Sequence, residues 1–175
     1  MRKMFVKTEN YRKFVSAVKA VEQRGAAEAG MMLVYGVPGL GKSHIVSSWA
    51  AETGAIFLRA NKDWTPRYAL SELAAALEID GRGNSQKLFA RLLKPIAANQ
   101  WPIVIDEAEF TLANQAASLE KIRDISDRAE NTVILIGMGN IQNDIKRYGQ
   151  ISSRIARVVE FLPATLEDVQ SACKQ

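Results

Sequence analysis

Cysteine and histidine are nearly missing from this sequence, and their scarcity removes whole classes of site. The 175 residues include one cysteine, Cys173, and one histidine, His44. A lone cysteine excludes a disulfide within the chain and a cysteine-based metal cluster, and a lone histidine disfavours a zinc site. We therefore expect a protein of the reducing cytoplasm, where thiols stay unpaired.

Long apolar runs are also missing. No stretch approaches the ~20 consecutive apolar residues that a membrane-spanning helix needs. The basic start of the chain lacks the apolar segment and the small-residue cleavage site of a secretory signal. Hydrophobic residues still make up 47% of the chain, which is enough for one globular domain with a single core and no membrane partner.

Acidic residues are outnumbered by basic ones, 19 to 23, which gives a net charge of +4. The sequence pI is near 9.3. Two interpretations stay open: an ordinary surface with a slight bias, or contact with a polyanion. The second requires the cations to cluster where such a ligand can lie.

Short apolar runs alternate with amphipathic stretches, a pattern typical of an α/β fold with a parallel sheet. The run at 132–137 is continuously apolar, as expected for a strand covered on both faces, whereas the last run is mixed and suits an edge strand. The predicted strands are residues 31–35, 55–60, 102–106, 132–137 and 157–161.

Apolar residues at helical spacing fill the intervals between these runs. Thr165, with Asp168 three residues later, has the pattern of a helix start close to the end of the chain. We interpret this last segment, residues 163–175, as the beginning of a truncated second domain after a core of residues 1–162. The other predicted helices start near Asn10 or cover residues 43–52, 68–77, 85–98 and 116–128.

A glycine-rich segment between the first strand and the next helix fits the pattern G-x-x-x-x-G-K-[ST], in the strand–loop–helix context that this motif requires. Its glycines let backbone N–H groups converge on phosphate oxygens, and the helix directs its positive end there. We expect Lys42 to reach the β and γ phosphates of ATP, and the Ser43 hydroxyl to be a Mg²⁺ ligand. The predicted ATP-binding residues are Gly36, Val37, Pro38, Gly39, Leu40, Gly41, Lys42, Ser43 and His44.

Two carboxylates follow the third predicted strand, at the sheet edge where open α/β folds bind ligands. Asp106 is the candidate for holding Mg²⁺, and Glu107 for orienting and deprotonating the attacking water. A base beside the magnesium carboxylate favours hydrolysis over transfer to a second substrate. The competing interpretation is two acids that merely cap a strand.

Two polar residues further along the chain are candidates for completing the site. Asn140 follows the fourth strand, where its amide can reach the γ-phosphate or cap the next helix. Arg154 lies near the domain edge, flanked by Arg147 and Arg157. It is either a surface arginine or one that reaches the nucleotide of a neighbouring subunit.

At these residues the chain resembles an AAA+ ATPase. Residues 36–43 are similar to its Walker A motif, 106–107 to its Walker B pair, Asn140 to sensor one and Arg154 to its arginine finger. The resemblance implies a P-loop NTPase core, a three-layer αβα sandwich with a mostly parallel five-stranded sheet. It also implies a C-terminal helical lid, of which residues 163–175 are the start and most is missing after Gln175.

Within that family the chain looks most like the phage Mu B transposition protein and its TniB and TnsC relatives. The similarity lies in residues 5–9, 136–140 and 150–157. It implies ATP-dependent assembly into a filament or ring on double-stranded DNA without sequence preference, target selection and stimulation of a transposase. Replication initiators and helicase loaders share the same sensor and Ser-Arg patterns and are the alternative. A phosphotransferase and a non-hydrolysing scaffold are the rivals from other classes.

The loop after the second strand lies where related assemblies face their DNA. Lys62 and Arg67 are candidates for phosphate contacts, with Trp64 between them. The alternative is a solvated loop in which Trp64 packs on the core.

Overall fold

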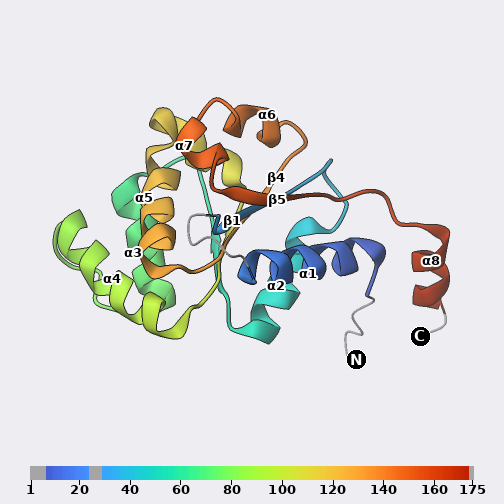
Figure 1. Cartoon of the computed structure of the whole chain (residues 1–175), viewed down its shortest axis with the longest axis horizontal. Helices are drawn as coiled ribbons and strands as arrows, with labels where there is room; N and C mark the ends of the chain where they lie inside the picture. The colour runs from blue at the N-terminus through green and yellow to red at the C-terminus, as the bar shows by residue number, and fades with distance from the viewer. Residues whose placement is uncertain (1–6, 24–28, 174–175) are drawn as a thin grey trace.

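A computed structural model of the chain describes residues 7–23 and 29–173 (Figure 1). It contains a five-stranded sheet in the order β2-β3-β4-β1-β5, in which every neighbouring pair is parallel. All five predicted strands are present, and the last is at an edge as expected. The strands are β1 Met31–Tyr35, β2 Ile56–Arg59, β3 Ile103–Asp106, β4 Val133–Gly137 and β5 Ile155–Glu160.

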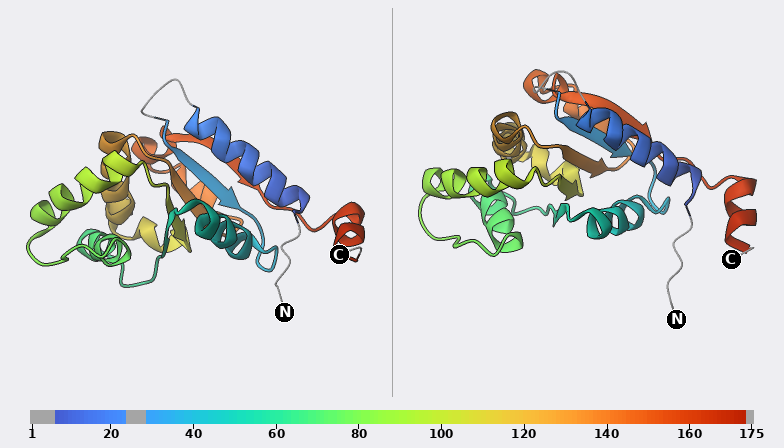
Figure 2. Two further views of the ribbon diagram at one scale, coloured as in Figure 1. Left: turned by 90° about the horizontal axis from the view of Figure 1, so that it is seen from below. Right: turned by 60° about the horizontal axis from the view of Figure 1, so that its bottom comes forward.

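Helices cover both faces of this sheet, which confirms the predicted three-layer sandwich (Figure 2). One face packs against α1 and α2, and the other against α3, α4 and α5. None of the described helices is long and apolar enough to cross a membrane. The helices are α1 Glu9–Glu22, α2 Lys42–Thr53, α3 Pro66–Ala76, α4 Ser85–Asn99, the 3₁₀ turn η1 Ala108–Leu112, α5 Ala113–Ala129, α6 Ile141–Ile145, α7 Gly149–Ser152 and α8 Leu166–Cys173.

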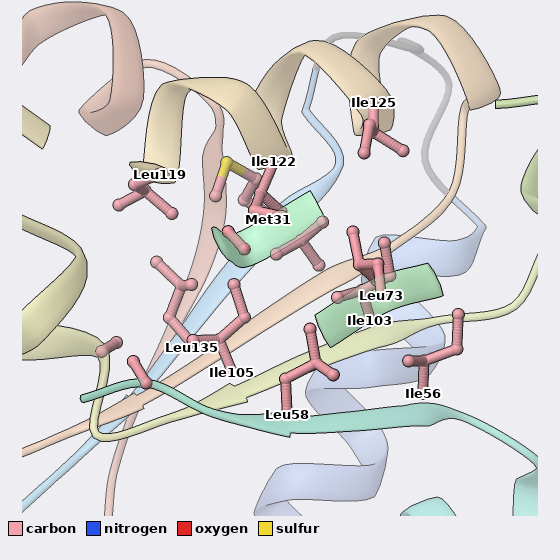
Figure 3. Packing of buried hydrophobic residues seen from close by; sticks show 14 of the residues in the cluster. Met31, Ile56, Leu58, Leu73, Ile103, Ile105, Leu119, Ile122, Ile125 and Leu135 are labelled. Atoms are coloured by element: carbon pink, nitrogen blue, oxygen red, sulfur yellow. The ribbon is translucent and has the colours of Figure 1, made fainter. Parts of the chain in front are cut away.

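The core is divided by the sheet because successive strand residues point to opposite faces. Met31 and Leu33 of β1 pack toward α3, α4 and α5, whereas Met32 and Val34 pack toward α1 and α2. Figure 3 shows the first of these clusters, in which Leu119 and other residues of α5 meet the strand residues. All five residues of β4 are buried, as its continuous apolar run predicted.

The sequence analysis predicted no element between β3 and residue 116, and the structure has the turn η1 there, one residue after β3. A 3₁₀ turn of this length has too few residues to show a period. Asn114, Gln115 and Ala116 have positive φ angles of 50°, 60° and 59°, so the regular right-handed part of α5 starts after them. That part coincides with the predicted helix at 116–128.

The last helix begins as predicted. Thr165 N–H donates to Asp168 Oδ2 at 3.1 Å, and Asp168 N–H donates to Thr165 Oγ1 at 3.2 Å. Asp168 Oδ1 also accepts from the N–H of Glu9 at 2.8 Å, so one carboxylate caps the starts of α8 and α1 together. Hydrogen bonds to this carboxylate lower the pKa of Asp168. The division into a core and the start of a lid stays a prediction.

The burial of Trp64 predicts its contribution to stability. The side chain is 2% exposed and belongs to the core on the α3–α5 face, so Trp64→Ala leaves a large cavity there. We expect the free energy of unfolding to fall by about 3–5 kcal/mol in denaturant titrations. Trp64→Phe is the milder control, because the indole N–H that it removes has no hydrogen-bond partner among the described residues. A Trp64→Ala variant as stable as the parent chain would contradict this packing.

Candidate nucleotide-binding site

The loop after β1 and the ends of β3 and β4 enclose a cavity of about 230 Å³ at the carboxyl edge of the sheet. Six of the nine predicted ATP-binding residues line it, and the other three, Gly36, Val37 and Leu40, do not. Binding of ATP by these residues stays a prediction. The lining residues are Pro38, Gly39, Gly41, Lys42, Ser43, His44, Asp106, Glu107, Glu109, Ile136, Gly137 and Met138.

Two glycines are required by the shape of the loop. A Cβ on Gly36 would lie 2.7 Å from the backbone oxygen of Phe161, so only glycine lets β1 turn away so close to the end of β5. Gly41 has a φ of 74° and is the N-cap of α2. This left-handed residue turns the chain so that α2 starts at the cavity, with its N–H groups and the positive end of its dipole facing inward.

Lys42 is positioned by the loop itself. Its Nζ donates to the backbone oxygens of Gly36 at 2.8 Å and of Val37 at 2.9 Å, and the residue is 9% exposed. Burial lowers the pKa of the Lys42 ammonium, and the nearby carboxylates of Glu109 and Asp106 oppose that shift. The ammonium is therefore held at the cavity wall, where an anionic ligand would meet it.

Ser43 and Asp106 meet across the cavity although 63 residues separate them. Ser43 Oγ donates to Asp106 Oδ1 at 3.0 Å, and the same oxygen accepts from the N–H of Glu107 at 3.0 Å. Hydroxyl and carboxylate oxygens are the donors that Mg²⁺ prefers, so these residues fit the predicted ion. The described residues include no cluster of three or more His, Cys, Asp or Glu that could hold a metal alone. Mg²⁺ commonly takes one or two protein oxygens and completes its shell with phosphate and water.

Glu107 lies beside Asp106 and lines the same cavity. Its φ of 55° is in the left-handed region, which is uncommon for a residue other than glycine and directs the chain into η1. Its side chain is 45% exposed, so water can reach the carboxylate.

Arg59 is a site residue that the sequence analysis missed. It ends β2 directly opposite Asp106 of β3, and its Nη2 lies 3.2 Å from Asp106 Oδ2. Its Nε lies 3.9 Å from Glu107 Oε1. One guanidinium thus touches both carboxylates at the end of β3. The available signal was a charged residue closing an otherwise apolar strand.

Glu109 is the second missed residue. It lines the cavity, and its carboxylate accepts a hydrogen bond from the N–H of Met138, just after β4. This contact joins η1 to the end of β4. With Asp106 and Glu107 it places three carboxylates on the wall of the cavity, so a bound polyphosphate needs cations beyond Lys42 and Arg59.

Asn140 lies at the N-cap position of α6, is exposed, and makes no side-chain capping hydrogen bond there. The cavity wall at the end of β4 is formed by Ile136, Gly137 and Met138, two or more positions earlier. The structure therefore does not bring Asn140 into the cavity with Lys42 and Asp106, and its sensor role stays a prediction.

Arg154 lies at the amino ends of the strands, opposite the carboxyl ends where the cavity lies. Its backbone oxygen accepts from the N–H of Met31, where β1 begins, whereas the phosphate loop follows the end of β1. Because β1 has five residues, its two ends lie about 13 Å apart. Arg154 Nε lies 3.2 Å from both carboxylate oxygens of Asp127. This arginine therefore points away from its own cavity, and a role at a nucleotide requires a second subunit.

The loop after β2 departs from the predicted DNA contacts. Trp64 is buried, which corrects its assignment to a DNA surface and agrees with the alternative of packing on the core. Arg67 Nη2 donates to the backbone oxygens of Gly81 at 2.6 Å and Gly83 at 3.1 Å, so its guanidinium braces a neighbouring turn. Lys62 is exposed, and its contact with DNA phosphates stays a prediction.

Several solved structures have the same fold. The Orc1 protein of Aeropyrum pernix in complex with DNA matches 94% of this chain and 47% of its own, with 18% identity and a TM-score of 0.66. Cdc6p of Pyrobaculum aerophilum matches 99% of this chain and 50% of its own, with 13% identity and a TM-score of 0.63. AMPPCP-bound DnaA of Aquifex aeolicus matches 90% of this chain and 48% of its own, with 19% identity and a TM-score of 0.57.

The chain thus spans about half the length of these three proteins, and at such identities the likeness shows the fold alone. Comparison with curated protein sequences finds no match. Residues 24–143, more than half of the chain, match the family of AAA domains. Together with the P-loop and the all-parallel sheet, this match shows that the chain belongs to the AAA domain family of nucleotide-binding proteins.

Proposed function

We propose that the protein is a DNA-binding ATPase that assembles with ATP and completes hydrolysis between subunits. The observation that carries the proposal is the contact of Ser43 with Asp106 at 3.0 Å, with Glu107 beside it on the same cavity. A hydroxyl and a carboxylate suit the binding of Mg²⁺, and the water-accessible carboxylate beside them suits the activation of water for hydrolysis.

Each residue has a role that follows from its position. The loop N–H groups and Lys42 bind the phosphates, and Mg²⁺, when bound through Ser43 and Asp106, neutralises charge on them. Glu107 accepts the proton of the attacking water. Arg59 orients the two carboxylates through its contacts at 3.2 and 3.9 Å.

Arg154 supplies the remaining charge from a neighbouring subunit. It lies at the amino ends of the strands, whereas its own cavity lies at their carboxyl ends. An arginine that acts in trans has to lie away from the cavity of its own subunit. The carboxylate of Asp127 holds its Nε, which leaves the guanidinium oriented before a partner arrives.

The cellular role that we propose is regulation of DNA transposition, through target selection and stimulation of a transposase. Its support is the similarity of residues 136–140 and 150–157 to the Mu B, TniB and TnsC proteins. A replication initiator or helicase loader is the second candidate, favoured by the fold neighbours Orc1 and DnaA. Electron microscopy of the protein with ATP and duplex DNA separates them: a helical filament favours transposition, and a discrete ring on a helicase favours the loader.

The loop and the base predict two different defects. Lys42→Ala should abolish ATP binding because it removes the ammonium from the phosphate loop. Glu107→Gln should keep ATP binding and lose hydrolysis, since an amide cannot accept the proton of water. Binding of a fluorescent ATP analogue and release of phosphate measure the two steps separately. Hydrolysis by Glu107→Gln at the parent rate would show that another group is the base.

Arg59 predicts an effect on magnesium. Its guanidinium lies 3.2 Å from the carboxylate that we assign to Mg²⁺, so Arg59→Gln removes a competing positive charge. The Mg²⁺ concentration for half-maximal ATP binding should fall roughly 2- to 5-fold, the modest size expected of an exposed charge. Arg59→Lys keeps the charge and should stay close to the parent. An unchanged Mg²⁺ titration of Arg59→Gln would argue against this placement of the ion.

The trans assignment predicts complementation between defective variants. Arg154→Ala should bind ATP normally and hydrolyse it slowly at every protein concentration, with a deficit of roughly 10³–10⁵ in the assembled state. Mixing it with Lys42→Ala should restore part of the activity, because one subunit offers an intact cavity and the other an arginine. Arg147→Ala, an exposed arginine paired with Asp144 at 3.7 Å, is the matched control. No rescue on mixing would exclude Arg154 as the trans residue.

A further inference from the structure

One stretch of the chain carries basic residues without any acidic ones. Residues 81–105 contain Arg82, Lys87, Arg91 and Lys94 and no acidic residue. This stretch therefore carries a formal charge of +4, which equals that of the whole chain. Residues 1–19 are also basic, with six basic residues and one acidic residue, but residues 81–105 are distinguished by having no acid among them.

Three of these cations share one face of α4. Lys87, Arg91 and Lys94 are spaced i, i+4 and i+7, and together they line one shallow groove with Ala90 and Pro95. At 1.5 Å per residue, they extend over about 10 Å of the helix axis. The opposite face of α4 is buried through Leu88, Leu92 and Ile96. We call Lys87, Arg91 and Lys94 the α4 stripe.

The turn before α4 is held rigidly by two arginines. Four consecutive backbone oxygens, of residues 80–83, accept hydrogen bonds from the guanidinium groups of Arg67 and Arg91. Arg91 Nη1 also lies 3.5 Å from Asp80 Oδ2, so the nearest acid is already paired. Arg82 is exposed within this turn, and its backbone lies next to Arg91 of the α4 stripe.

Cations also flank the stripe on the side of α5. Lys121 and Arg128 lie over the ring of Phe89 at 5.2 and 5.3 Å from its centroid. Both views of Figure 2 place α4 at the end of the molecule remote from α1 and α8. The stripe is therefore on an outer surface that a large ligand can approach.

We propose that the α4 stripe and Arg82 bind the phosphate backbone of duplex DNA. Lys87, Lys94 and Arg82 contact the phosphates, and Arg91, whose guanidinium holds the turn, adds its charge between them. A row about 10 Å long fits a polyanion better than a single small anion, since duplex DNA carries one charge per ~1.7 Å of its axis. Ala90, between the cations, leaves space for close approach. Single strands are bound by stacking on aromatic rings, and the one aromatic of α4, Phe89, is covered by cations. Phosphate contacts of this kind carry no sequence information.

This inference rests on the proposed function, because DNA is the partner named there. It moves the DNA surface from the loop after β2, where Trp64 and Arg67 have structural roles, to the outer face of α4. Lys62 lies outside the stripe and is not needed for it.

The test is Lys87→Ala combined with Lys94→Ala, assayed with ATP on two duplexes of unrelated sequence. Both lysines are exposed, and neither forms an ion pair within the described parts of the chain, so the fold should be unaffected. Lys19→Ala combined with Lys146→Ala removes the same charge from exposed positions on α1 and at the end of α6. Thermal unfolding of both double variants checks that they fold alike.

Affinity should fall similarly on both duplexes, and the plot of log K against log salt should become shallower by about 2 for the α4 variant. The control variant should follow the parent chain. Equal binding of DNA by the parent and the α4 variant would overturn the inference and leave DNA binding itself in place. The same equality is expected if the stripe binds an acidic protein and not DNA. A parent chain that binds no duplex at any salt concentration would overturn both the inference and the proposed partner.

Discussion

The hydrogen bond between Ser43 and Asp106 is the contact on which the site depends. In the sheet order, β4 lies between β1 and β3, so the loop after β1 must cross the end of β4 to reach the carboxylate. That crossing encloses the cavity and makes Gly137 and Met138 part of its wall. Gly36 permits it by packing against the oxygen of Phe161, where a Cβ would lie 2.7 Å away. The glycine pattern and the strand order are thus two parts of one geometrical requirement.

The length of β1 separates two functions. The phosphate loop follows its last residue, and Arg154 is bonded at its first, so a subunit cannot bring its own arginine to its own nucleotide. Under the proposed function, such a site is incomplete in one copy of the chain, so assembly would control hydrolysis. A polyanion that aligns several copies along the α4 stripe would then promote both assembly and hydrolysis.

Local patterns were predictable, and long-range contacts were not. The loop at 36–43, the pair at 106–107 and the capping residues Thr165 and Asp168 each depend on neighbours within eight positions, so the sequence alone identifies them. The contact of Arg59 with Asp106 joins residues 47 apart and depends on β2 lying beside β3. The placement of Trp64 was undecided because an aromatic after a strand suits the core and a DNA surface equally, and only packing distinguishes them.

The central claim is that ATP is hydrolysed at a site completed by a second subunit on DNA. Release of free phosphate, measured per subunit over a range of protein concentrations with and without long duplex DNA, tests it most directly. The account predicts specific activity that rises with protein concentration and rises further with DNA. A constant specific activity, or transfer of the phosphate to an acceptor in place of water, would contradict it.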